Sequence, residues 1–134
     1  MIILDASAAA DACLRLEPES SWVRGRLAEP GESLHAPHLI DVEVMGAIRK
    51  SILGGIVPEA RGRQAFEAFR AMRIRRYVHA AFLERAWQLR ANLTASDAMY
   101  VALAEALDAP LVTTDERLGR APGHRARVQA FPAV

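Results

Sequence analysis

The sequence lacks the features that would place the protein in a membrane or an oxidising compartment. Its only cysteine, Cys13, has no partner within the chain, which excludes an internal disulfide. The longest unbroken apolar run, Ala98 to Ala104, has seven residues, whereas a transmembrane helix needs about 20. The first apolar residues are not preceded by a basic region, so a signal peptide is not expected. We therefore expect a cytoplasmic protein without membrane association.

Aromatic residues and excess charge are also scarce. Aromatics make up 6% of the chain, and 17 basic residues stand against 16 acidic ones, for a formal net charge of +1. This balance excludes binding to nucleic acid through bulk positive charge alone. Hydrophobic residues make up 51% of 134, which excludes a disordered chain and is enough for a compact core. No repeat or linker divides the sequence, so we predict a single domain over residues 1–134.

Short apolar stretches alternate with helical patterns along the chain. Strands are predicted for residues 1–4, 33–37, 74–79, 110–113 and 127–131. Helices are predicted for residues 6–16, from Pro18 to the stop at Pro30-Gly31, and for residues 39–53, 58–72, 81–93 and 97–107. This alternation predicts an α/β fold in which helices cover both faces of a parallel sheet of about five strands. In the 39–53 helix, the expected apolar face consists of Leu39, Val42, Ile48 and Ile52.

Four acidic residues follow predicted strands or lie near the start of predicted helices. Asp5 and Asp115 come directly after strands, Glu43 lies in the first turns of the 39–53 helix, and Asp97 begins the 97–107 helix. Ligands of open α/β sheets bind beyond the carboxyl ends of the strands, so these acids could converge there. Clustered carboxylates repel one another, and a hard divalent cation such as Mg²⁺ or Mn²⁺ would relieve that repulsion. Such a site supports hydrolysis of phosphate esters and phosphodiesters.

Each of these acids also has a structural interpretation. Asp5 or Asp97 could cap the helix that it precedes, although Ser96 would cap the 97–107 helix equally well. Asp41 lies beside Glu43 and competes with it for the same role. The residues alone leave these alternatives open.

Three stretches of the chain match the pattern of a known family. They read IILDAS, EVMGAIRKSILGGIV and TASDAMYVALAEALDAPLVTTDERL, and the closing strand follows them. The chain resembles PIN-domain proteins, and more narrowly the VapC toxins of bacterial type II toxin–antitoxin modules. The resemblance implies a PIN-like three-layer α/β/α fold and a Mg²⁺- or Mn²⁺-dependent endoribonuclease. It assigns catalysis and metal binding to Asp5, Glu43, Asp97 and Asp115, and supporting hydroxyls to Ser7 and Thr113.

The same resemblance implies partners and exposes one departure from the family pattern. It implies an RNA substrate, a homodimer and a VapB-like antitoxin whose carboxyl-terminal segment blocks the pocket. An exposed apolar patch on the 39–53 helix and on Trp22, Val23 and Leu27 would receive a partner. Gly46 stands where the family usually has an asparagine, and glycine costs about 0.5–1 kcal/mol of helix stability relative to alanine. We expect this change to affect the geometry around the acids rather than the activity.

Arginines concentrate in two stretches that could contact the phosphates of RNA. Residues 61–76 carry six arginines against one acid, a local net charge of +5, and a second basic group follows Asp115. The planar guanidinium group bonds two phosphate oxygens at once. The candidate RNA contacts are Arg73, Arg75, Arg76 and Arg117. The competing interpretation is a solvated surface paired with acids, and the competing function is a non-catalytic PIN-fold module that binds RNA or protein.

Overall fold

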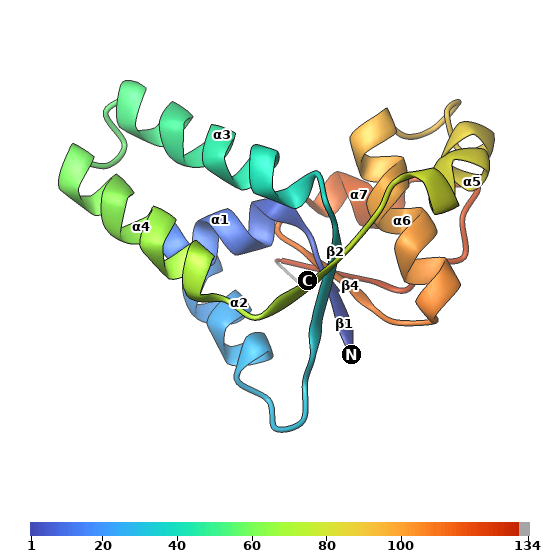
Figure 1. The fold of residues 1–134 in the computed structure, drawn as a ribbon, viewed down its shortest axis with the longest axis horizontal. Helices are drawn as coiled ribbons and strands as arrows, with labels where there is room; N and C mark the ends of the chain where they lie inside the picture. Colours follow the sequence, from blue (N-terminus) through green and yellow to red (C-terminus); the bar gives the residue numbers. More distant parts are fainter. Residues whose placement is uncertain (132–134) are drawn as a thin grey trace.

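The computed structural model describes residues 1–131, in which five short strands form one parallel sheet (Figure 1). The strands are β1 (Ile2–Leu4), β2 (Leu34–Pro37), β3 (Ile74–Tyr77), β4 (Leu111–Thr113) and β5 (Val128–Ala130). Their order across the sheet is β3-β2-β1-β4-β5, and each neighbouring pair is parallel. The predicted sheet of about five short parallel strands is confirmed. The predicted single domain extends to residue 134, and its last three residues lie outside the described part.

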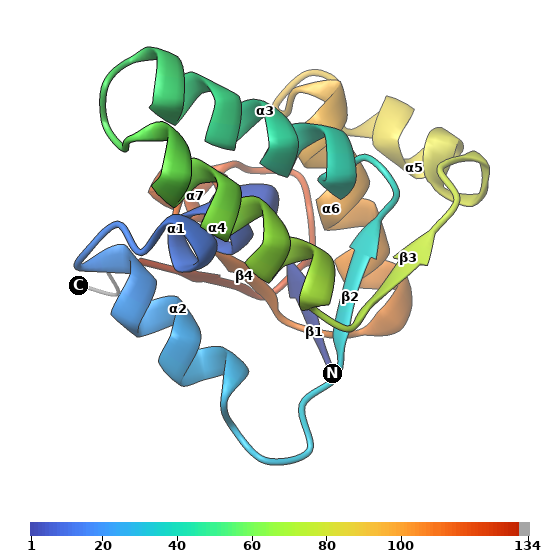
Figure 2. The ribbon, with the colours of Figure 1, turned by 60° about the vertical axis from the view of Figure 1, so that its left-hand side comes forward.

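Helices cover both faces of this sheet. They are α1 (Ala6–Leu14), α2 (Glu19–Leu27), α3 (Ile40–Leu53), α4 (Glu59–Ala71), α5 (Leu83–Gln88), α6 (Ala95–Leu107) and α7 (Glu116–Arg120). Figures 1 and 2 show α1 to α4 on one side of the sheet and α5 and α6 on the other. The three-layer architecture expected from the sequence is therefore confirmed. No helix within residues 1–131 combines the length and the apolar content that crossing a membrane requires.

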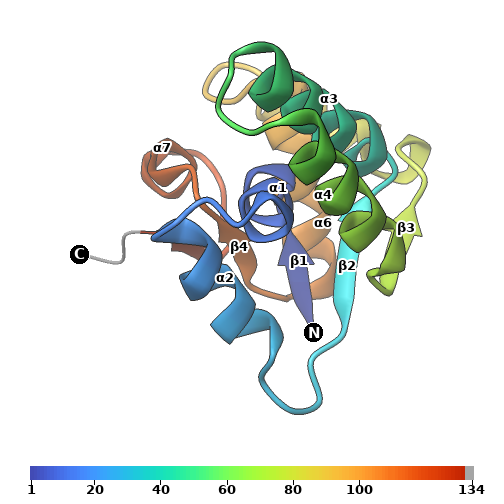
Figure 3. The same cartoon turned by 90° about the vertical axis from the view of Figure 1, so that its left-hand side faces the viewer.

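The centre of the core is formed by β1, β4 and α6. Ile2, Ile3 and Leu4 are fully buried because β1 lies between two other strands and under helices on both faces. In α6, every residue from position 98 to 104 is buried, as its continuous apolar run predicted. This helix packs against β1, β2 and β4 on one side and α5 on the other, so it has almost no solvent-facing stripe. Figure 3 shows α1 and α6 on opposite sides of β1.

The predicted apolar face of α3 is wrong in part. The buried residues are Ile40, Val44 and Ile48, which follow the i, i+4 spacing of one helical stripe, whereas Val42 is 68% exposed. Apolar residues occupy two stripes of this helix, and the sequence does not say which one meets α1 and α4. Contact with those two helices selects the stripe that begins at Ile40.

Two other predictions need correction. The helix predicted over residues 81–93 is a 3₁₀ turn (Ala80–Phe82) followed by α5, which ends at Gln88. The expected exposed patch on α2 is absent, because Val23 is fully buried and the Trp22 ring packs 5.7 Å from the ring of Phe131. The carboxyl-terminal strand β5 brings Phe131 to this helix, a contact that the pattern of α2 alone does not contain.

Candidate functional site

Asp5 lies at the carboxyl end of β1, beside the end of β4. The parallel register pairs Leu4 with Val112, which places Asp5 next to Thr113. The Thr113 hydroxyl donates to Asp5 Oδ2 at 2.6 Å, and the Ser7 hydroxyl donates to the same oxygen at 2.8 Å. Asp5 is only 6% exposed, and burial raises the pKa of its carboxyl while the two hydroxyls oppose that rise. Asp5 occupies the N-cap position of α1 but makes no side-chain capping bond.

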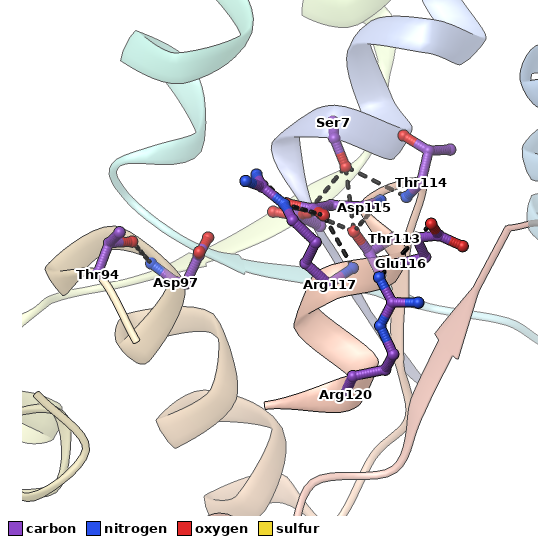
Figure 4. A network of polar contacts seen from close by, with 10 residues as sticks. Ser7, Thr94, Asp97, Thr113, Thr114, Asp115, Glu116, Arg117 and Arg120 are labelled. Atoms are coloured by element: carbon purple, nitrogen blue, oxygen red, sulfur yellow. Dashed lines mark hydrogen bonds and ion pairs between the residues drawn. The ribbon is translucent and has the colours of Figure 1, made fainter. Parts of the chain in front are cut away.

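Ser7 and Thr113 form a hydroxyl bridge between the ends of β1 and β4. Their hydroxyl oxygens are 3.1 Å apart, and Thr113 is fully buried. The backbone N–H of Thr114 donates to Ser7 Oγ at 3.2 Å, and that of Asp115 donates to Thr113 Oγ1 at 3.0 Å (Figure 4). The two hydroxyls therefore connect Asp5 to the segment that carries Asp115.

Asp97 lies in the first turn of α6 without capping it. Thr94 is the N-cap, and its hydroxyl oxygen accepts from the backbone N–H of Asp97 at 3.2 Å. Neither Asp97 nor Ser96 is the cap, because the helix begins two residues earlier than predicted. The Asp97 carboxyl is half-buried, and its pKa is raised by burial and by the charge of Asp115.

Glu43 reaches the site from α3, whereas its neighbour Asp41 is engaged elsewhere. Glu43 Oε1 accepts from the Tyr100 hydroxyl at 2.9 Å, and Tyr100 is fully buried in α6. Burial and the charges of Asp5 and Asp97 raise the pKa of Glu43. Asp41 accepts a forked pair of hydrogen bonds from Arg76 at 2.7–2.9 Å. Of the two acids, Glu43 is therefore the one that lies near the other predicted site residues.

Asp115 differs from the other three acids because it already has a cationic partner. Arg117 Nε and Nη2 each donate to the Asp115 carboxylate at 3.1 Å, and the backbone N–H of Arg117 also donates to it at 3.0 Å. These bonds lower the pKa of Asp115. In Figure 4, Asp97 lies at the start of α6, and Asp115 and Arg117 lie at the start of α7.

The four acids suit a hard divalent cation in the kind of ligand they offer. All four supply carboxylate oxygens, and burial together with mutual repulsion raises the pKa of three of them. A cation among them would offset both effects. As the side chains stand, no three acidic, histidine or cysteine residues within positions 1–131 lie close enough to surround one ion. Asp115 would have to exchange its contact with Arg117 for the ion.

Comparison with known proteins identifies the family. The family model described as the PIN domain matches residues 2–123. The chain belongs to the PIN-domain family. It is 42% identical over 129 residues to Ribonuclease VapC12 of Mycobacterium tuberculosis, a match that covers 96% of this chain and 98% of that protein. It is 43% identical over 122 residues to Ribonuclease VapC1 of the same organism, covering 90% of each. This PIN-domain chain therefore groups with the VapC ribonucleases, which confirms the resemblance seen in its sequence.

Solved structures of PIN-domain proteins share the fold. VapBC2 of Rickettsia felis, solved with a DNA fragment from its promoter, matches with a TM-score of 0.69 at 17% identity, covering 97% of this chain and 98% of that one. VapC20 of Mycobacterium tuberculosis, described as a sarcin-ricin loop cleaving toxin, matches with a TM-score of 0.67 at 13% identity, covering 90% and 94%. At these identities the matches support the architecture of the PIN domain.

The arginines predicted to contact RNA occupy three different environments in this PIN domain. Arg76 is engaged by Asp41, and Arg117 by Asp115. Arg73 and Arg75 make no ion pair within residues 1–131 and line a separate groove of about 680 Å³ between β2, β3 and the end of α2. Arg73 precedes β3, so it lies toward the amino ends of the strands, whereas Asp5 and Asp115 follow strands. The four arginines predicted to contact RNA therefore do not share one surface around the predicted acidic site.

Two contributors to the PIN-domain site were missed in the sequence. Tyr100 lies in the apolar run of α6, and its hydroxyl donates to Glu43. The signal that could have identified Tyr100 is a single phenol hydroxyl in a fully buried helix, because such a hydroxyl needs a hydrogen-bond partner. Thr114 donates to Asp11 Oδ2 at 2.8 Å and ties α1 to the loop after β4. Asp11 lies in the middle of a helical pattern, and nothing in its sequence context distinguishes it from a solvated helix residue.

Proposed function

We propose that this VapC-type protein is a Mg²⁺- or Mn²⁺-dependent endoribonuclease and the toxin of a type II toxin–antitoxin module. The observation that supports the metal dependence best is that Asp5, Glu43, Asp97 and Asp115 lie near enough for their charges to raise the pKa of neighbouring acids in the set. Three of the four carboxyl groups have a raised pKa, which is unfavourable for the folded protein at neutral pH unless a cation joins them.

In this proposal the four carboxylates would hold the cation, which lowers the pKa of the attacking water and stabilises charge on the phosphate. Ser7 and Thr113 favour the ionised form of Asp5 and orient its carboxylate through their bonds to Oδ2. Tyr100 orients Glu43 from the buried face of α6. Arg117, once it leaves Asp115, is free to bind a phosphate oxygen of the RNA, since a guanidinium group suits that ligand.

Cleavage of RNA by matched carboxylate variants tests this proposal. Wild type should cut single-stranded RNA with Mg²⁺ and not with excess EDTA, and Asp97→Asn should reduce the rate by at least about a thousandfold, as losses of catalytic groups commonly do. Asp41→Asn is the control, because Asp41 is an acid of α3 that pairs with Arg76. Equal rates for all three proteins would reveal a contaminating nuclease. Metal-independent RNA binding without cleavage would favour the non-catalytic module instead.

We further propose that a VapB-like antitoxin binds the apolar surface between α3 and α4. Two hollows of about 370 and 260 Å³ lie there, both lined by Met45 and Phe66, and Met45 is 53% exposed. Apolar side chains of an antitoxin segment would fill these hollows. Met45→Glu should abolish co-purification with the co-expressed antitoxin while the protein remains folded.

A homodimer would use a different surface in this proposal. Val78, Leu83 and Trp87 are all more than half exposed and lie close together in sequence around the 3₁₀ turn and α5. Leu83→Glu should convert a dimer to a monomer in light scattering and leave antitoxin binding intact. Met45→Glu should abolish antitoxin binding and leave the dimer intact, so each variant serves as the control for the other. A wild-type protein that stays monomeric at high concentration would contradict the dimer.

A further inference from the structure

A small cavity lies directly beside two of the four acids. It occupies about 190 Å³ between the start of α6 and α7. Its lining residues are Asn92, Leu93, Thr94, Asp97, Asp115, Arg117, Leu118 and Ala121. This volume corresponds to about six water molecules and is below the range of pockets that hold drug-sized ligands. The cavity, called here the Asn92 cavity, has room for one small planar group.

Three of the eight residues that line the Asn92 cavity are apolar, and the other five carry polar or charged side chains. Leu93, Leu118 and Ala121 supply the apolar contacts, and Leu118 is almost completely buried. The polar side chains include the amide of Asn92 and the guanidinium group of Arg117. Apolar walls accommodate the faces of a nucleobase, and neutral polar groups at a rim read the hydrogen-bonding edge of the base.

The Asn92 amide keeps its full hydrogen-bonding capacity within the described residues. Its side chain is exposed, and none of the hydrogen bonds within residues 1–131 uses the amide. The turn at Gly123, where φ is +92°, passes so close that a Cβ there would lie 2.9 Å from Asn92 Nδ2. Glycine suits this turn because of its positive φ, and the atom that a Cβ would meet lies at the end of an exposed side chain. The amide retains two donors and an acceptor for a ligand.

We infer that the Asn92 cavity receives the unpaired nucleobase adjacent to the scissile phosphate and that Asn92 is a specificity-determining residue. This inference rests on the proposed ribonuclease function. A phosphate near Asp97 and Asp115 would place the attached nucleotide within reach of the cavity, because both acids line it. Sequence-specific recognition of RNA relies on unpaired bases whose edges are accessible, and a side-chain amide pairs with such an edge through a donor and an acceptor together.

Cleavage of a single-stranded RNA pool with randomised sequence tests the inference. Sequencing of the product ends gives the base frequencies at each position that flanks the cut. Wild type should prefer one base by about tenfold at one of the two flanking positions, and Asn92→Ala should reduce that preference below about threefold. Asn92→Asp should change the preferred base, because the carboxylate replaces the amide donor with an acceptor. Gln88→Ala is the control, since this amide lies on α5 and does not line the cavity.

A binding selection separates failure of this inference from failure of the proposed function. The same RNA pool is selected for binding to Asp97→Asn and to the double variant with Asn92→Ala. If base preference in binding depends on Asn92 and wild type does not cleave, the ribonuclease proposal is overturned and the Asn92 cavity is supported as a base-binding site. Cleavage with equal flanking frequencies in wild type and Asn92→Ala would overturn the cavity alone. Urea unfolding of each variant confirms that a changed preference does not come from a misfolded protein.

Discussion

Replacement of Thr113 by valine tests whether its hydroxyl supports the acidic site. The substitution keeps the branched shape of the side chain and replaces the hydroxyl with a methyl group. Thr113 is fully buried, donates to Asp5 Oδ2 at 2.6 Å and accepts from the backbone N–H of Asp115 at 3.0 Å. Both partners would lose this group, and no water can replace it at a fully buried position without a rearrangement.

The structure gives the size of the effect. A hydrogen bond to a charged group contributes about 1.5–3 kcal/mol, and the half-buried N–H of Asp115 adds about 1 kcal/mol when it loses its acceptor. The new methyl group offsets roughly 0.8 kcal/mol through its burial. Thr113→Val should therefore lower the free energy of unfolding by about 2–3 kcal/mol, which leaves a typical domain folded.

Urea unfolding at pH 7, compared with Thr114→Val, measures this effect. Thr114 is the adjacent residue, is only partly buried and donates to Asp11, so the same substitution there should cost about 1 kcal/mol. The slope of the unfolding free energy against urea should not change. If Thr113→Val is no less stable than Thr114→Val, the hydroxyl does not support Asp5 as we have argued.

The pH dependence gives this prediction a second, independent check. The Thr113 hydroxyl lowers the pKa of Asp5 because it donates to the ionised carboxylate, although burial leaves that pKa above 3.8 in the folded protein. The stabilisation by Thr113 is therefore largest above the raised pKa of Asp5 and shrinks as the pH falls through it. The difference in stability between wild type and Thr113→Val, measured by urea unfolding over a range of pH, should therefore decrease as the pH is lowered.

Three further predictions follow from the same contacts. Asp97→Asn should stabilise the metal-free protein at pH 7, because folding raises the pKa of the Asp97 carboxyl and disfavours its ionised form. Urea unfolding in EDTA should show a gain in the free energy of unfolding that disappears below about pH 4. Arg117→Gln should strengthen Mn²⁺ binding by at most about fivefold in calorimetry, since the exposed pair with Asp115 contributes about 0–1 kcal/mol. Gly46→Ala should raise the free energy of unfolding by about 0.5–1 kcal/mol, because a Cβ at position 46 would meet no other atom. Gly62→Ala should lower the free energy of unfolding by about 1–3 kcal/mol, because a Cβ at position 62 would overlap with a side chain of α3. An unchanged Gly62→Ala protein would show that the Ile52 side chain moves aside without cost.

Much of the fold was predictable because periodicity and strand composition determine it locally. The buried strand β1 and the fully buried helix α6 are continuous apolar runs, which have few alternatives inside a small α/β domain. The face of α3 was not predictable, because Val42 and Val44 are equally apolar and only the neighbours of the helix decide between them. The ring of Trp22 in α2 likewise packs against Phe131, a residue more than 100 positions away.

Less of the candidate site was predictable, because hydrogen bonds between distant segments determine which acidic residues belong to it. Position after a strand was enough to nominate Asp5 and Asp115, because parallel strands end at a common edge. The distinction between Glu43 and Asp41 depends on partners that the local sequence does not contain. Those partners are Tyr100 for one acid and Arg76 for the other.

The near-zero net charge has a different physical meaning once these partners are known. Most acids outside the site face an arginine, as Asp41 faces Arg76 and Glu105 faces Arg85, so their charges are neutralised locally. Asp5 and Asp97 have hydroxyl and backbone partners but no ion pair within residues 1–131, and both have a raised pKa. Although the chain has sixteen arginines, none forms an ion pair with Asp5 or Asp97 within residues 1–131, and the ionised forms of both acids are disfavoured. Their charge is what a cation would have to compensate, whereas Asp115, at the start of α7, already pairs with Arg117.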